Sequence, residues 1–190
     1  MREFGEMLGA WNGFYVMIGS SAAALTGLMF VVITLVRDQQ RSATGAGIST
    51  FSTPTVVHFC CALFTAALMS APFRSLVPIA IILGLAGAAG LFYIVRIGLR
   101  QSKLENYQPD AEDFAWHVLL PFIAYATLIT GALALHAAAS QALYAPAAAV
   151  TLLIFVGIHN AWDVVTYLAL SKAETSPDQP GNGGGTQNSD

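Results

Sequence analysis

Long stretches without any charged residue dominate the pattern of hydrophobic and polar positions along this chain. Asp, Glu, Lys and Arg are absent from residues 7–36, 42–73, 75–95 and 114–162. A helix needs about 20 predominantly apolar residues to cross the hydrocarbon core of a bilayer, so each of the first three runs accommodates one crossing. The fourth run would be about 74 Å long as one helix, more than twice that thickness. It therefore has to fold back once, and we expect the turn at the weakly polar pair Ser140 and Gln141.

This pattern predicts an all-α, polytopic integral membrane helix bundle. The five expected transmembrane helices cover residues 11–36, 53–71, 76–100, 114–138 and 144–172. Residues 1–10 precede them as an amphipathic lead-in, because apolar residues recur there at helical spacing. Residues 173–190 are almost free of large apolar side chains and are expected to form a disordered tail.

Composition agrees with a membrane protein. The chain has 190 residues, of which 55% are hydrophobic and only 10% charged, whereas soluble domains average about 25% charged residues. Its eight Lys and Arg residues are spread along the chain and form no basic patch, so we expect the lipid bilayer and not a nucleic acid as partner. Cys60 and Cys61 are neighbours on one helix, which disfavours a disulfide between them and predicts two buried free thiols.

The distribution of basic residues predicts the orientation of the bundle. Arg2 and Arg74 fall on one side of the expected membrane. Six basic residues fall on the other side: Arg37, Arg41, Arg96, Arg100, Lys103 and Lys172. Basic residues accumulate on the cytoplasmic side of membrane proteins. We therefore expect the N-terminus outside and the C-terminus in the cytoplasm, in a plasma membrane such as the bacterial inner membrane.

Two of the expected helices carry small residues at helical spacing, which allow a second helix to approach closely. The helix at 11–36 contains Gly19, Ala23 and Gly27, and the helix at 76–100 contains Gly84 and Gly87. We expect these two helices to be the closest-packed ones. The same stripes make a homo-oligomer, or a small membrane complex, a reasonable expectation.

The last expected helix contains the most informative polar residues. At about 100° per residue, His159, Asp163, Thr166 and Tyr167 share one arc, with Asn160 at its edge. An ionisable residue deep in a membrane costs roughly 2.5–3.5 kcal/mol on insertion scales, so it needs a partner or a water-filled cavity. We expect this polar face to look inward, with His159 and Asp163 as the most deeply placed pair.

Other polar residues are expected in the same cytoplasmic half of the membrane. His58 and His117 stand near the cytoplasmic ends of their helices, and so do Arg96 and Tyr93. His58, His117, His159 and Asp163 could together supply the ligands of a metal ion such as zinc or copper. Arg96, Asn160, Tyr93 and Tyr167 would support that site.

These observations predict a non-enzymatic membrane protein whose polar site binds or conducts a small cation, a proton or a metal. Two alternatives stay open. The polar cluster could fix helix packing in an accessory or scaffold subunit. It could also hold haem, between two histidines, or copper in a membrane redox subunit. No phosphate-binding glycine loop, nucleophile elbow, CxxC or HExxH motif is present.

Overall fold

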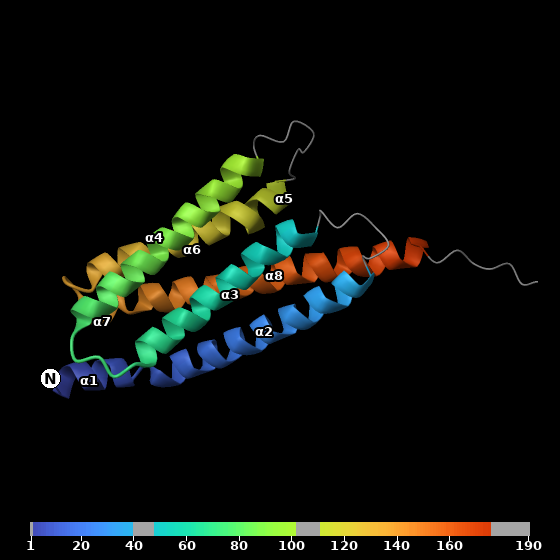
Figure 1. The fold of residues 1–190 in the computed structure, drawn as a ribbon. Helices are drawn as coiled ribbons and strands as arrows, with labels where there is room; N and C mark the ends of the chain where they lie inside the picture. Colours follow the sequence, from blue (N-terminus) through green and yellow to red (C-terminus); the bar gives the residue numbers. More distant parts are fainter. Residues whose placement is uncertain (1, 40–47, 102–110, 176–190) are drawn as a thin grey trace, which may run out of the picture.

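The structure, a computed structural model, describes residues 2–39, 48–101 and 111–175, and the side chains of residues 6–34, 54–99 and 111–166. Within these segments all regular structure is helical (Figure 1). The helices are α1 (Arg2–Gly9), α2 (Asn12–Gln39), α3 (Ile48–Ser70), α4 (Leu76–Gln101), α5 (Ala111–Phe114), the π-helical turn η2 (Ala115–Leu119), α6 (Leu120–Ala134), α7 (Ala139–Ala142) and α8 (Tyr144–Thr175).

Four stretches are long and apolar enough to cross a membrane. They are Asn12–Thr34, Leu76–Leu99, Ala111–Ala134 and Ala139–Thr166. A shorter apolar stretch, Pro54–Ser70, belongs to α3. The predicted helical class and these hydrophobic helices are therefore confirmed.

Two helix ends differ from the sequence prediction. Helix α3 begins at Ile48, five residues earlier than expected, so Pro54 lies inside the helix and not in its first turn. Helix α8 continues to Thr175, so the first three residues of the predicted tail are helical. The rest of that tail lies outside the described residues.

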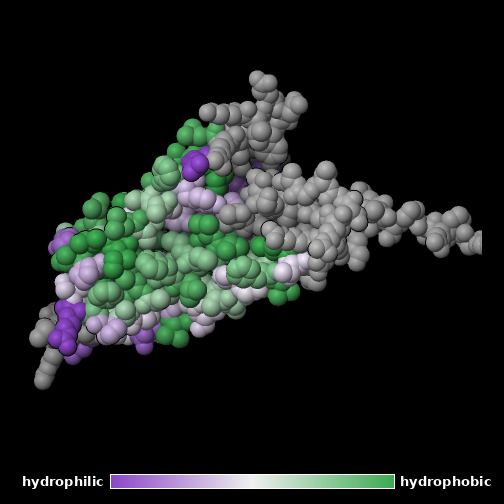
Figure 2. Space-filling view, in the orientation of Figure 1, coloured by the Kyte–Doolittle hydropathy of each residue, from purple (hydrophilic) through white to green (hydrophobic). Residues whose placement is uncertain are grey.

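Helix α8 occupies the centre of the bundle. It contacts α2, α3, α6 and η2, while α2 packs along α3 and α4 packs along α6 (Figure 1). In its apolar window 56% of the residues are buried, compared with 17% in that of α2. The outer surface of the bundle is largely hydrophobic. Large apolar side chains such as Phe30, Phe92, Leu133 and Phe155 are exposed on it, and Figure 2 shows green hydrophobic residues over the middle of the visible face.

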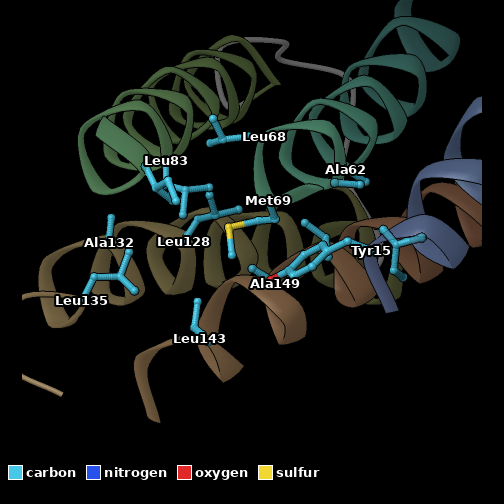
Figure 3. Packing of buried hydrophobic residues seen from close by; sticks show 14 of the residues in the cluster. Tyr15, Ala62, Leu68, Met69, Leu83, Leu128, Ala132, Leu135, Leu143 and Ala149 are labelled. Carbon is cyan, nitrogen blue, oxygen red and sulfur yellow. The ribbon is translucent and has the colours of Figure 1, made fainter. Parts of the chain in front are cut away.

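Buried apolar side chains form two clusters inside the bundle. The larger cluster joins α2, α3, α4, α6 and α8 through residues such as Tyr15, Met69, Leu83, Leu128 and Ala149 (Figure 3). The smaller cluster is formed by Ile94, Ala124, Tyr125 and Leu153. Helix α1 extends the larger cluster at the end where α3 turns into α4, because Met7 and Leu8 pack against it. This end is called the α1 end below, and the opposite one the α5 end.

Glycines of α4 bring α4 and α6 into close contact, as the small residues in the expected helix at 76–100 predicted. An ideal Cβ atom built on Gly90 would lie 2.2 Å from the Tyr125 ring, and one on Gly87 would lie 2.8 Å from Ile129. The prediction for α2 holds only in part. Gly19 faces Ala66 of α3 at 3.3 Å, whereas a Cβ on Gly27 would meet no described atom within 4 Å.

The chain reverses where the pattern predicted. Helix α6 ends at Ala134, and α8 begins at Tyr144 after the short α7, which contains Ser140 and Gln141. The helix is also irregular near Pro121, which has no N–H to donate within the helix. There the backbone forms the π turn η2, in which the Leu120 N–H donates to the Ala115 carbonyl. An extra residue is thus accommodated directly before the proline.

The two cysteines are free thiols, as expected. Only one of them is shielded. Cys61 is half-buried, whereas Cys60 is exposed on the outer surface of α3, so the prediction of two buried thiols is wrong for Cys60. The reason is the roughly 100° between neighbouring helical residues, which turns one thiol outward when the other faces the bundle.

Candidate polar site in the bundle

The predicted pair on α8 is present. His159 Nδ1 lies 3.2 Å from Asp163 Oδ2, one helical turn away. The two side chains retain 29% and 47% of their exposure, so the pair is not sealed inside the bundle. Asp163 stands about 28 Å along the helix axis from Tyr144 at 1.5 Å per residue, close to the thickness of a bilayer core. The pair therefore sits near the α5 end of the bundle, where water can reach the carboxylate.

Trp116 covers the imidazole of His159. The two rings are parallel, with an interplanar angle of 4° and centroids 3.8 Å apart. Trp116 belongs to η2, so the π turn before Pro121 sets the register of the helix that carries this indole. The imidazole is thus packed against the indole ring and lies beside the carboxylate of Asp163. The resulting cluster of Trp116, His159 and Asp163 is called the α5-end cluster.

We expect the stacked rings to be energetically coupled. In a double-mutant cycle, Trp116→Leu and His159→Leu should show a coupling energy of about 0.5–1.5 kcal/mol in the free energy of unfolding. A cycle that pairs Trp162→Leu with His159→Leu is the control, because Trp162 is 70% exposed. Equal coupling in the two cycles would contradict the stacking.

His58 is the most completely buried histidine among the described residues that were predicted to form the site. Its side chain, on α3, has no exposed surface, and its Nδ1 lies 2.9 Å from the hydroxyl of Tyr125 on α6. Tyr125 is itself fully buried and held against Gly90. The other ring nitrogen, Nε2, has no hydrogen-bond partner. His58 thus has one satisfied and one unsatisfied nitrogen inside the bundle.

Asn160 lies at about the same depth as His58. Helices α3 and α8 run in opposite directions (Figure 1), and Gly157 of α8 meets Phe59 of α3. At 1.5 Å per residue, Asn160 is about 4.5 Å beyond Gly157 and His58 about 1.5 Å beyond Phe59, both toward the α5 end. The two polar residues are therefore within one helical turn of each other along the membrane normal.

Asn160 also faces the interior on the side where His58 and Tyr125 lie. It is 1% exposed, and neither its amide nitrogen nor its amide oxygen has a partner. At about 100° per residue it points about 20° away from Leu153, which packs in one cluster with Tyr125. His58, Tyr125 and Asn160 are called the buried layer.

The buried layer is well suited to exchanging protons. If the Tyr125 hydroxyl donates to Nδ1 of His58, Nε2 carries the hydrogen and needs an acceptor. If the hydroxyl accepts, Nε2 is the acceptor and needs a donor. A carboxamide offers both, and so does a water molecule, so Asn160 is compatible with either tautomer. An unsatisfied buried polar group costs about 1–3 kcal/mol, which favours water at such a place.

The structure does not bring all predicted site residues together. His117 Nδ1 is 3.0 Å from the carbonyl oxygen of Asp113, within the turn that precedes α6. Arg96 is exposed, Tyr93 packs beside the smaller apolar cluster, and the Tyr167 side chain lies outside the described residues. Within the described part of the chain, no three His, Cys, Asp or Glu side chains are grouped closely enough to hold a metal ion. The four predicted ligands are thus divided between the buried layer and the α5 end.

Two partners in the site were not identified from sequence. Tyr125 and Trp116 lie in an apolar segment whose contacts depend on the folding back of α6 against α3 and α8. Trp116 lies five residues before Pro121, and Tyr125 lies four residues after it. The π turn directly before Pro121 could not be placed from the sequence alone. Comparisons with protein-family models, with curated proteins and with solved structures found no match. The chemistry of the site is therefore argued from its geometry.

Proposed function

We propose that this chain is an integral membrane protein of five spans that transfers protons through the buried layer and the α5-end cluster. Helix α3 would be the fifth span, since its 23 residues reach about 35 Å at 1.5 Å per residue. Of the basic residues predicted on the cytoplasmic side, Arg37, Arg96, Arg100 and Lys172 belong to helix segments at the α5 end, whereas Arg74 lies in the turn at the α1 end. This supports an α5 end in the cytoplasm and an N-terminus outside.

The observation that carries the proposal is the set of unsatisfied polar atoms in the buried layer. His58 Nε2 and both amide atoms of Asn160 are buried without partners, in a bundle with few other polar side chains. Such atoms are costly unless water or a mobile proton satisfies them. Asn160 directly follows His159 in α8, so the buried layer adjoins the water-accessible pair.

The residues would act in sequence. Asp163 and His159 take up a proton from cytoplasmic water, and the two groups share it as a coupled pair. The proton then passes by way of Asn160 and bound water to Nε2 of His58. As His58 releases the proton on Nδ1 to the oxygen of Tyr125, Tyr125 passes its own hydroxyl proton on to water, so that the imidazole changes tautomer and neither residue need hold a net charge. Each proton that enters is matched by one that leaves.

The donor set favours a proton over a metal. A bound zinc or copper ion takes three or four side-chain ligands within about 2.0–2.3 Å, and the described residues offer no such group. His58 has a single nitrogen available, since Tyr125 occupies the other. A proton needs only a chain of groups that both donate and accept.

Proton flux into liposomes tests this proposal. The protein is reconstituted with a trapped pH dye, and a potassium gradient with valinomycin drives protons inward. We expect acidification with wild type, and flux at the level of empty liposomes with Asp163→Asn or His58→Leu. His136→Gln is the matched control, because His136 is exposed in the turn after α6 and should leave the flux unchanged.

Other outcomes would overturn the proposal. Wild-type liposomes that acidify no faster than empty ones would remove proton transfer altogether. If His58→Leu and Asp163→Asn lowered only the stability, with no flux to lose, the cluster would serve helix packing, as in the scaffold alternative. Flux that persists in both variants would show that the route avoids these residues.

A further inference from the structure

The described part of α3 carries a line of buried polar residues that continues beyond the buried layer. Thr55, His58 and Thr65 are all fully buried. At about 100° per residue they fall within an arc of about 80°, and they extend over about 15 Å of helix. The half-buried Cys61 lies at the edge of this arc, one helical turn before Thr65. Apolar side chains would be less costly to bury at these positions, so we look for a role of the polar side chains that are present.

The line continues onto α2 through Tyr15. This residue is 1% exposed, and its hydroxyl has no hydrogen-bond partner, like the hydroxyl of Thr65. Its ring extends from α2 toward Ala149 on α8 (Figure 3). Ala149 is eight residues before Gly157, about 12 Å nearer the α1 end, and this is about the depth of Thr65. Tyr15 and Thr65 thus add two more unsatisfied hydroxyls at one depth.

A pocket opens directly beyond these hydroxyls. It lies at the α1 end, has a volume of about 320 Å³, and is lined by Leu8 and Asn12 on one side and by Met69, Ser70 and Phe73 on the other. Asn12 precedes Tyr15 by one turn of α2, and Met69 follows Thr65 by one turn of α3. The pocket therefore lies about one helical turn from Tyr15 and Thr65, and Met69 is part of its lining.

We propose that these elements form the outer half of the proton route. Water in the pocket would be linked past the flexible side chain of Met69 to Tyr15 and Thr65, and from there along Cys61 to the buried layer. This inference rests on the proposed proton transfer, and it adds the path between the buried layer and the outside. Protons move along it by hopping between hydroxyls and water molecules, with no change in the number of bonds to any residue.

Thr65→Val and Tyr15→Phe test the outer half in the same liposomes. Each change keeps the shape of the side chain and removes an unsatisfied hydroxyl. We expect the flux to fall to the background of empty liposomes, while thermal stability in detergent stays the same or rises. Thr34→Val is the control, because the Thr34 hydroxyl is exposed and bonds only to the carbonyls of Phe30 and Val31 on its own helix.

The outcomes separate this inference from the function on which it rests. Wild-type flux that depends on His58 but survives both Thr65→Val and Tyr15→Phe would overturn the outer path and leave the proposed function standing. Absence of wild-type flux would overturn both. A loss of flux together with unfolding of Thr65→Val would contradict the idea that its hydroxyl is unsatisfied.

Discussion

Gly90→Ala should lower the free energy of unfolding by about 1–3 kcal/mol, a large effect for one added methyl group. The new Cβ would lie 2.2 Å from ring carbons of Tyr125, closer than non-bonded carbons approach. The ring cannot swing aside, because it is fully buried and its hydroxyl contacts His58. The cost must therefore appear as a displacement of α4 or of α6, which carries the ring with it.

Gly84→Ala is the matched control on the same face of α4. Its Cβ would meet Ala132 at 3.8 Å, an ordinary van der Waals distance, so its stability should stay within about 0.5 kcal/mol of wild type. Unfolding in mixed micelles, followed by circular dichroism, measures both variants. Equal stabilities would contradict the described contact between α4 and α6. Proton flux should also fall in Gly90→Ala alone, because only there does the Tyr125 hydroxyl shift.

The hydrophobic helices could be predicted from the sequence because each is encoded locally. Uncharged runs of sufficient length define them, and the 114–162 run had to fold back for reasons of length alone. The start of α3 could not be placed, because residues 48–52 are uncharged and mix Ile48 and Phe51 with serine and threonine. A proline one turn further on suggested a later beginning than the structure has.

The contact within helix α8 was equally predictable from the sequence, whereas the contacts of the site between helices were not. His159 and Asp163 are four residues apart on one helix, so their contact follows from helical geometry. Whether they face the interior depends on neighbouring helices, and here the expectation was wrong. Asp163 keeps 47% of its exposure, while Asn160, placed at the edge of the polar arc, is buried at 1%.

One signal for the interior was present in the sequence of α3. Thr55, His58 and Thr65 recur on one face of α3, and all three are buried. The partner of His58, Tyr125, is on α6, far away along the chain, and this pairing depends on how the helices associate. A single sequence does not encode that association in any local pattern.

The hydrogen bond between His58 and Tyr125 should be visible when the free energies of unfolding of single and double variants are compared. Tyr125→Phe leaves both nitrogens of a buried imidazole without a protein partner, and His58→Leu leaves a buried hydroxyl alone. Each should lower the free energy of unfolding by about 1–3 kcal/mol. The double variant should be more stable than the sum of the two losses implies, because an apolar pair leaves nothing unsatisfied.

Stability and proton transfer should separate in that double variant. His58→Leu with Tyr125→Phe restores packing but offers no group that can accept or donate a proton, so its liposomes should acidify only at background rate. Tyr93→Phe is the control for the loss of a tyrosine hydroxyl, since Tyr93 packs at the margin of the same cluster and lies outside the proposed route. If the double variant conducted protons like wild type, the buried layer would be only a packing device. If it were as unstable as the two single changes added together, the 2.9 Å contact between His58 and Tyr125 would not be the hydrogen bond assigned to it.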